Sequence, residues 1–120
     1  KIVSHHLGGM IPFFWGRINE TYSPADQQKT IGRTLPEPLF KYFSLFYYDT
    51  AVGGSVSAVK CAYDVFGASQ LVFATDNPHG PGTGEIRLAT YPGVIKSLGL
   101  SEAENKQIFE GNARKILGLI

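Results

Sequence analysis

The sequence predicts an α/β fold built on a parallel β-sheet, and three observations support this fold class. Short runs of β-branched and aromatic residues, typical of strands, occur at residues 2–5, 45–48 and 71–74. A polar residue follows each run. A loop of small residues and then a helical pattern come next. Parallel strands need crossover connections, which are usually helical, so the alternation indicates a parallel sheet covered by helices.

The first unit begins with the strand at residues 2–5. Pro12 can open a helix that runs through Asn19, since proline suits the first helical turn. The polar stretch from Glu20 to Thr34 is expected to be a long surface loop. A second short helix is expected near residues 36–43, before the next strand.

The second unit contains the clearest helix. Ser55 is expected to cap its N-terminus, and Gly67 is expected to end it. Apolar residues recur between them at helical spacing and give the helix one apolar face, as packing on a sheet requires; they are Val56, Val59, Ala62, Tyr63 and Phe66.

The third unit contains a candidate active-site loop at residues 77–84, whose glycines and prolines predict irregular structure. A helix is expected from Glu85 to Leu98. Ser101 and Glu104 then form a capping box, in which each side chain can bond the other residue's free amide. The tail is expected to be helical through Phe109 and again over residues 113–117.

Composition and charge exclude several classes of function. The 120 residues include 11 basic and 10 acidic ones, so the net charge of +1 predicts no nucleic-acid partner. No run of about eighteen apolar residues exists, which predicts no transmembrane helix and no membrane partner. Cys61 is the single cysteine and cannot form an intrachain disulfide. It is expected to be a packed core thiol in a reduced compartment, so we expect a cytoplasmic protein.

Three strand and helix units cannot close a barrel. An open sheet of three strands leaves two edges and half a core exposed. The chain also begins inside a predicted strand, at Ile2 and Val3. We therefore expect a missing N-terminal portion, or another chain, to complete the sheet.

Ionisable residues follow each predicted strand: His6, Asp49 and Asp76. In a parallel α/β barrel the active site lies at the C-terminal ends of the strands, where these residues are expected. An imidazole can act as a general base or a metal ligand, and a carboxylate can bind a divalent cation or move a proton.

Each candidate also has a structural interpretation. His5 and His6 would point to opposite faces of an extended strand, so at most one is expected to be catalytic, and the other would bond the backbone. Asp76 precedes Asn77-Pro78 and could form an Asx-turn, while Asp49 could cap the following loop. His79 lies in the glycine-rich loop, where an exposed side chain is the simpler expectation.

Four segments together resemble the branch of the amidohydrolase superfamily that includes aminocarboxymuconate semialdehyde decarboxylase and resorcylate decarboxylase. They are Ser4-His5-His6-Leu7-Gly8-Gly9-Met10-Ile11-Pro12-Phe13-Phe14-Trp15-Gly16-Arg17-Ile18, Phe46-Tyr47-Tyr48-Asp49-Thr50-Ala51, Leu71-Val72-Phe73-Ala74-Thr75-Asp76-Asn77-Pro78 and Ile108-Phe109-Glu110-Gly111-Asn112-Ala113. The resemblance implies that residues 1–120 are the C-terminal portion of one TIM (β/α)8 barrel domain, comprising strands 6 to 8 with their helices.

The resemblance also implies roles for individual residues. His6 matches the active-site histidine, and Asp76 matches the strand-eight aspartate that binds the metal or transfers a proton. Arg17 matches an arginine that binds a substrate carboxylate across a dimer interface, and Asp49 is given a supporting role. Asn77 and Ala74 depart from the family pattern, which leaves the substrate open.

The function implied is that of a metal-dependent decarboxylase acting on an aromatic or unsaturated carboxylic acid. The expected cofactor is a divalent metal, zinc or manganese, and the expected assembly is a homo-oligomer, either a dimer or a tetramer. Two alternatives stay open: hydrolysis or hydration of a lactone, amide or unsaturated diacid, and a noncatalytic half-barrel that serves as an assembly module. The family's metal-binding His-x-His motif and its strand-five histidine have no counterpart in this sequence.

Overall fold

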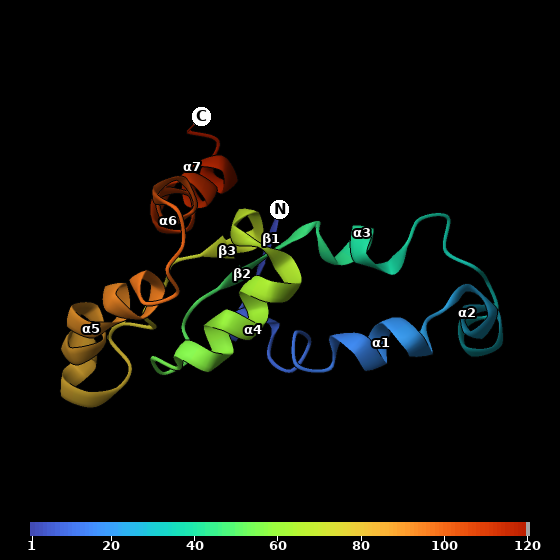
Figure 1. Cartoon of the computed structure of the whole chain (residues 1–120), viewed down its shortest axis with the longest axis horizontal. Helices are drawn as coiled ribbons and strands as arrows, with labels where there is room; N and C mark the ends of the chain where they lie inside the picture. The colour runs from blue at the N-terminus through green and yellow to red at the C-terminus, as the bar shows by residue number, and fades with distance from the viewer. Residues whose placement is uncertain (120) are drawn as a thin grey trace.

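A computed structural model describes residues 1–119, in which three parallel strands form one sheet in the order β1-β2-β3 (Figure 1). The strands are β1 (Ile2–Ser4), β2 (Phe46–Asp49) and β3 (Leu71–Val72). Val3 pairs with Tyr47 in the first ladder, and Asp49 pairs with Val72 in the second. The predicted parallel sheet is thereby confirmed.

Strand β3 is shorter than the predicted run of residues 71–74 because its backbone leaves the ladder after Val72. The Phe73 N–H donates to the Ile108 carbonyl at 3.0 Å. The Ala74 N–H donates to the Thr50 hydroxyl at 3.0 Å. Both amides therefore find partners outside the sheet, so β3 ends four residues before Asp76.

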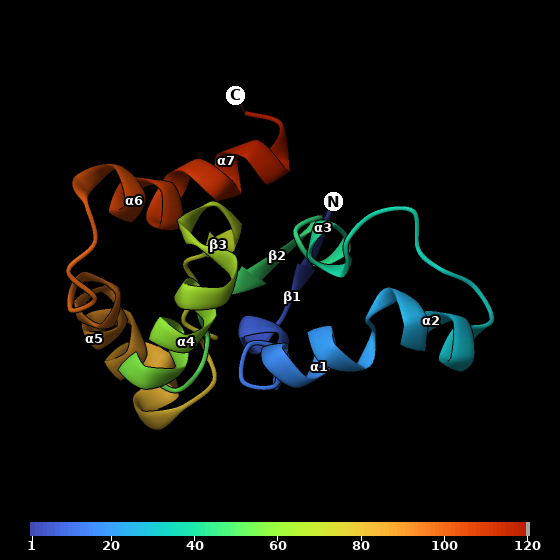
Figure 2. The same cartoon turned by 45° about the vertical axis from the view of Figure 1, so that its right-hand side comes forward.

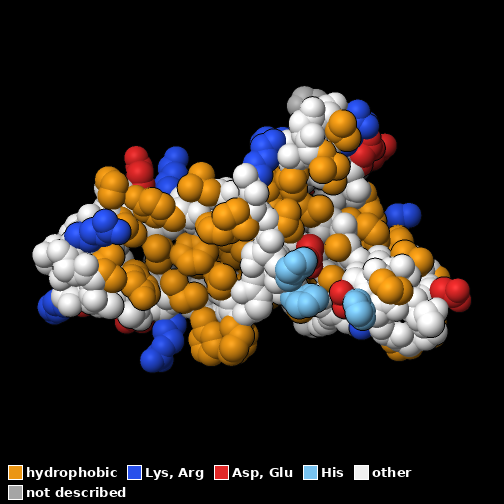
Figure 3. All heavy atoms as spheres, turned by 180° about the vertical axis from the view of Figure 1, so that it is seen from behind, with side chains coloured by type: hydrophobic (Ala, Val, Ile, Leu, Met, Phe, Trp, Pro, Cys, Tyr) orange, Lys and Arg blue, Asp and Glu red, His pale blue; other side chains and the backbone are white. Residues whose placement is uncertain are grey.

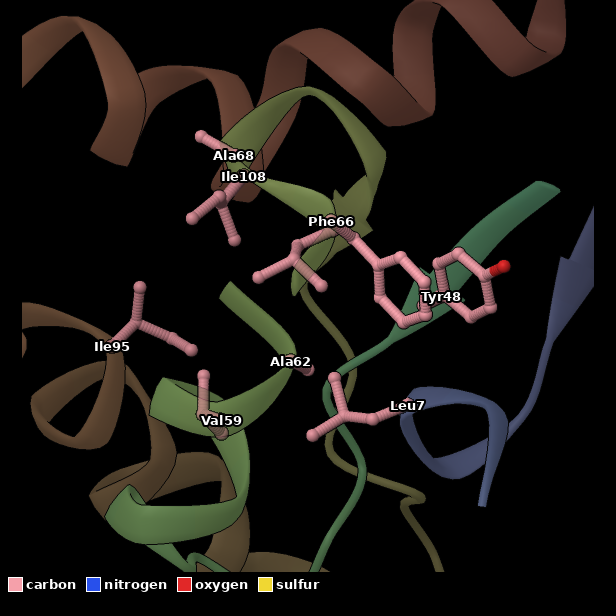
Figure 4. Packing of buried hydrophobic residues seen from close by; sticks show 9 residues of the cluster. Leu7, Tyr48, Val59, Ala62, Phe66, Ala68, Ile95 and Ile108 are labelled. Carbon is pink, nitrogen blue, oxygen red and sulfur yellow. The ribbon is translucent and has the colours of Figure 1, made fainter. Parts of the chain in front are cut away.

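Helix α4 (Val56–Phe66) lies in front of the sheet in Figure 1 and organises the hydrophobic core (Figure 4). Its bounds match the prediction, and the Ser55 hydroxyl caps it by accepting the Ala58 N–H at 3.2 Å. The Phe66 ring stacks on the Tyr48 ring, with centroids 4.0 Å apart. The same buried cluster contains Leu7, Val59, Ala62, Ala68, Leu71, Ile95 and Ile108.

The connection from β1 to β2 contains three helices, which extend to one side of the sheet (Figures 1 and 2). They are α1 (Trp15–Thr21), α2 (Pro24–Ile31) and α3 (Leu39–Phe43). Helix α1 begins three residues after the predicted start at Pro12. The molecule measures 49 × 32 × 26 Å along its principal axes, and α2 lies at the far end of this extension.

Helix α2 corrects the prediction of a loop from residue 20 to residue 34. Proline occupies its first turn at Pro24, and Gly32 adopts the left-handed conformation that commonly follows a helix. Gln27 is buried, and its amide donates to the Tyr22 carbonyl at 2.6 Å and accepts the Leu35 N–H at 2.6 Å. The buried residue of α2 is thus a polar one, Gln27, and the helix lacks the apolar face that would have predicted it from the sequence.

The C-terminal part consists of α5 (Glu85–Lys96), α6 (Glu102–Lys106) and α7 (Asn112–Leu117). A π-helical turn at residues 107–111 joins α6 to α7, where the sequence predicted a break after Phe109. The predicted capping box is present. Hydrogen bonds from Ser101 and Tyr63 hold the pKa of the Glu104 carboxyl below its ordinary value. None of the helices in residues 1–119 is long and apolar enough to span a membrane.

Candidate active site

The ionisable side chains that follow the three strands come to one edge of the sheet. His5 and His6 follow β1, Asp49 ends β2, and Asp76 follows β3 in the chain. Histidine side chains gather beside acidic side chains on the face seen from behind (Figure 3). This face is opposite the one that α4 covers in Figure 1. The predicted convergence of polar residues at the carboxyl ends of the strands is therefore present.

Asp49 is the buried centre of this group, with 6% of its surface exposed. One carboxylate oxygen, Oδ1, accepts the backbone N–H of His6 at 2.8 Å and that of Ala51 at 3.1 Å. The other, Oδ2, lies 2.8 Å from Nδ1 of His5. Asp49 therefore does cap its own loop, as one interpretation of the sequence expected, and it also binds the segment after β1.

His6 lies in a tight turn rather than on an extended strand. His6 and Leu7 both have positive φ angles, 53° and 57°, which side-chain-bearing residues seldom adopt. The turn directs the Leu7 side chain into the core, where 2% of its surface is exposed. Nδ1 of His6 lies 2.6 Å from the Ala51 carbonyl oxygen, and its ring is exposed to solvent.

A mainly apolar cavity of about 260 Å³ lies between this turn and the start of α4. His6 contributes to its wall, together with Pro12, Phe13, Val52 and Cys61. Cys61 is half-buried along this wall, whereas the sequence predicted a thiol packed in the core.

Asp76 lies at the start of the glycine-rich loop and has a φ angle of 65°. Its carbonyl accepts the His79 N–H at 2.8 Å, so this residue begins a turn, although through its backbone rather than through an Asx-turn. Its carboxylate accepts a hydrogen bond from the Arg87 guanidinium at 2.9 Å. The Asp76 side chain is 35% exposed and that of Arg87 is 21% exposed.

The residues present form only part of a metal site. A protein-bound zinc ion needs at least three protein ligands, and manganese or magnesium sites likewise gather several oxygen or nitrogen donors. Within residues 1–119, no group of three or more His, Cys, Asp and Glu side chains is placed to hold a metal ion. Asp76, a carboxylate already paired with Arg87, is the one ligand candidate that the sequence predicted.

Arg17 does not join the other predicted site residues. It lies exposed on α1, beside a shallow surface cavity that Phe14, Ile18 and Tyr22 also line. Within residues 1–119, no hydrogen bond or ion pair connects Arg17, His6 and Asp76 to one another.

The sequence did not predict two contacts of the site, that of Arg87 with Asp76 and that of His5 with Asp49. Arg87 was expected only as part of the helix from Glu85, and whichever of His5 and His6 is not catalytic was expected to bond the backbone. The strand register indicates the contact between His5 and Asp49, because Ser4 pairs with Tyr48 and the next residues along the two strands are therefore neighbours. For Arg87 we find no such signal, because the irregular loop between Asp76 and α5 sets its position.

Comparison with known proteins gives consistent matches. The amidohydrolase family model matches residues 1–119. The 6-methylsalicylic acid decarboxylase of Penicillium expansum is 25% identical over 116 residues, covering 97% of this chain and 34% of the relative. The crystal structure of 5-carboxyvanillate decarboxylase from Sphingomonas paucimobilis superposes with a TM-score of 0.75 at 24% identity, over 97% of this chain and 33% of that one.

A second similar structure is the dihydroxybenzoic acid decarboxylase of Polaromonas sp. JS666, determined with bound manganese and the inhibitor 2-nitroresorcinol. It has a TM-score of 0.66 and 24% identity, over 99% of this chain and 34% of that one. The chain thus spans about a third of the length of the proteins that it matches.

Proposed function

The chain belongs to the amidohydrolase family, and from this membership we propose that the full-length protein is a metal-dependent decarboxylase of an aromatic or unsaturated carboxylic acid. The observation that carries the proposal is that the similar proteins in three organisms are all decarboxylases of carboxylated aromatic acids. The structural support is the ionisable edge of the sheet, because TIM barrels carry their active sites at the carboxyl ends of the strands. Residues 1–120 would then supply strands 6 to 8 of one barrel domain.

Decarboxylation replaces a carbon-carboxylate bond with a carbon-hydrogen bond, so the site must deliver one proton to that carbon. We assign proton handling to His6 and Asp76, both of which lie at the ionisable edge. His6 has an exposed ring whose Nδ1 is bound to the Ala51 carbonyl, which leaves Nε2 free. Arg17 is assigned to a substrate carboxylate, since a guanidinium can bond both carboxylate oxygens at once.

Asp76 is also proposed as this chain's single ligand to a divalent metal. Zinc and manganese are the candidates, and manganese is the metal bound in the similar Polaromonas structure. The remaining ligands would come from the part of the protein outside this chain. We further propose a cytoplasmic homo-oligomer, which is consistent with the single cysteine and with a substrate-binding arginine exposed on α1.

The reaction is tested with the full-length protein supplied with manganese or zinc. It is incubated with a panel of carboxylated phenols, unsaturated diacids and aromatic lactones, and released carbon dioxide is measured beside ring-opened and hydrated products. Carbon dioxide release from a carboxylated phenol is expected. Hydrolysis or hydration without carbon dioxide release would contradict the decarboxylase and favour a hydrolase or hydratase.

Asp76 is tested by metal analysis of the Asp76→Asn variant. Asparagine tolerates the positive φ angle better than alanine, so this change removes the charge with less backbone strain. We expect lower metal content and slower turnover. The matched control is Asp64→Asn, which alters an exposed aspartate paired with Lys60 on α4 and should leave both unchanged. Wild-type metal content in Asp76→Asn would remove Asp76 from the ligand set.

A further inference from the structure

The register between β1 and β2 determines the face of the sheet on which His5 lies. Ser4 of β1 pairs with Tyr48 of β2, and Tyr48 packs against Phe66 of α4. Side chains alternate along a strand, so the next position on each strand points to the opposite face. His5 and Asp49 occupy these positions and contact each other. They therefore lie on the face away from α4, which corresponds to the interior of a closed barrel.

The contact between His5 and Asp49 determines which nitrogen of the imidazole carries the hydrogen. Oδ1 of Asp49 already accepts two backbone N–H groups, and a carboxylate has no hydrogen to donate, so the hydrogen between Oδ2 and His5 is assigned to Nδ1 of the imidazole. The neutral ring of His5 then has its lone pair on Nε2. The His5 side chain is 83% exposed while that of Asp49 is 9% exposed. Asp49 thus fixes one edge of the ring, and the other edge is open to a ligand.

Backbone hydrogen bonds hold the Asp49 carboxylate in place. Asp49 makes its remaining hydrogen bonds to the backbone of His6 and Ala51, so its carboxylate cannot turn without releasing two amides. Its own strand is anchored by Tyr48, which is 1% exposed. A buried carboxylate held in this way orients an imidazole and selects its tautomer, as do the carboxylates that bond metal-binding histidines and the histidine of a catalytic triad.

We propose that His5, oriented by the buried carboxylate of Asp49, is a proton-transfer group of this site in addition to His6. Asp49 is its positioning residue. The inference rests on the proposed decarboxylase function. It adds a second imidazole, whose free Nε2 lies on the barrel-interior face, whereas His6 borders the apolar cavity next to α4.

Proton transfer from His5 accompanies the loss of carbon dioxide. Protonated His5 gives its Nε2 proton to the ring carbon that bears the carboxylate, and two ring electrons form the new carbon-hydrogen bond. The carbon-carboxylate bond then breaks, its electron pair returns to the ring, and carbon dioxide leaves. Neutral His5 regains a proton from the solvent, so each turnover consumes one proton. The net reaction converts a carboxylate and one proton to carbon dioxide and the unsubstituted aromatic.

The test compares His5→Gln, His6→Gln and Asp49→Asn in the full-length, metal-loaded protein, with the carboxylated phenol that the wild type decarboxylates. For His5→Gln we expect kcat to fall by about 100-fold or more, the usual contribution of general acid-base catalysis, with little change in KM. Lys41→Gln is the control. The Lys41 side chain is exposed on α3, outside the group of side chains at the strand ends, and this variant should keep wild-type turnover.

Asp49→Asn isolates the positioning role. The amide oxygen of asparagine can still accept the N–H groups of His6 and Ala51, but its NH₂ group would face Nδ1 of His5 and donate to it. The neutral ring must then carry its hydrogen on Nε2. Histidine ring nitrogen and carbon shifts, measured by NMR on protein labelled at histidine, are expected to report this change of tautomer together with a lower kcat.

Each outcome of these experiments supports or overturns one assignment. If His5→Gln turns over within about threefold of wild type while His6→Gln loses activity, the inference is overturned and the proposed function stands. If Asp49→Asn lowers activity without changing the His5 tautomer, Asp49 has a structural role only, and its assignment as positioning residue is overturned. If the wild type releases no carbon dioxide from any substrate, the proposed function fails, and this inference fails with it.

Discussion

The Arg87 guanidinium donates a 2.9 Å hydrogen bond to the Asp76 carboxylate, which joins the first turn of α5 to the segment that follows β3. The positively charged Arg87 side chain competes with a metal ion for the oxygen atoms of this carboxylate. We expect Arg87→Gln to raise the affinity of the metal-stripped, full-length protein for Mn²⁺ by about twofold to fivefold, since partly exposed ion pairs contribute roughly 0.2–1 kcal/mol. Isothermal titration calorimetry measures the affinity.

Arg114→Gln is the matched control for Arg87→Gln. Arg114 pairs with Glu110 at 3.4 Å near the start of α7, and its loss should leave Mn²⁺ affinity unchanged. A lower affinity in Arg87→Gln would contradict the prediction. It would mean that Arg87 holds Asp76 in the orientation that a metal requires.

Gly8 and Gly9 form a matched pair in the turn that carries His6. Both have positive φ angles, 75° and 64°. A Cβ on Gly8 would lie 2.9 Å from the Tyr48 ring, whereas a Cβ on Gly9 would meet nothing within 4 Å. Gly9 has a ψ angle of −120°, outside the left-handed helical region, so Gly9→Ala should cost about 1–3 kcal/mol in backbone strain alone. Gly8→Ala should cost about 1–3 kcal/mol more, because it overpacks Tyr48.

Urea unfolding of the full-length protein measures both glycine variants. We expect Gly8→Ala also to lower turnover, because its clash with Tyr48 displaces the turn that holds both histidines. Equal destabilisation by the two substitutions would show that the Tyr48 ring moves aside, and the prediction would then be wrong.

The sequence predicted the parts of the fold that depend on local pattern. Ser55 and Gly67 bound α4 because capping preferences and helical spacing agree there. The loop predicted over α2 was wrong because that helix buries Gln27, a polar residue that hydropathy patterns assign to solvent. The π-helical turn at residues 107–111 also has no pattern distinct from an ordinary helix.

The sequence predicted where the candidate site residues lie but not which side chains they contact. The strand ends placed His6, Asp49 and Asp76 at one edge. The partners of these residues depend on register and on loop geometry, which single segments do not specify. His5 meets Asp49 through the β1–β2 register. Arg87 reaches Asp76 across a loop whose path is set by residues in left-handed conformations, Gly82 and Thr83 among them.

Asn112 joins the start of α7 to the sheet. It is 2% exposed, and its amide donates to the carbonyls of Ala68 and Leu71 at 2.8 and 2.7 Å. Asn112→Asp keeps the shape of the side chain but provides no donor and buries a charge. We expect it to cost about 3 kcal/mol or more in the free energy of unfolding, because buried carbonyls lose their partners.

Urea unfolding of the full-length protein measures the cost of Asn112→Asp. Asn19→Asp on α1 is the control, since Asn19 is exposed and surface substitutions usually stay within about 0.5 kcal/mol. Equal stability of the two variants would show that the Ala68 and Leu71 carbonyls find other donors.

Tyr48 predicts how stability depends on alkaline pH. Burial raises the pKa of the Tyr48 hydroxyl to about 12, from its ordinary value of 10.0. Between these values the unfolded chain loses this proton while the folded chain keeps it, so unfolding becomes easier as pH rises. The contribution of Tyr48 to the free energy of unfolding is fully present below about pH 10 and is lost by about pH 12. This loss is of the order of 2 kcal/mol.

Tyr48→Phe should remove this part of the pH dependence. Below pH 10 the variant should be less stable by about 1 kcal/mol, because the Tyr48 hydroxyl donates to the Phe43 carbonyl at 2.9 Å and phenylalanine cannot. Urea unfolding at a series of pH values from neutral to alkaline gives both quantities. As pH rises, the stability difference between wild type and variant should shrink and then reverse. A constant difference across the series would mean that burial of Tyr48 is not the source of the alkaline loss.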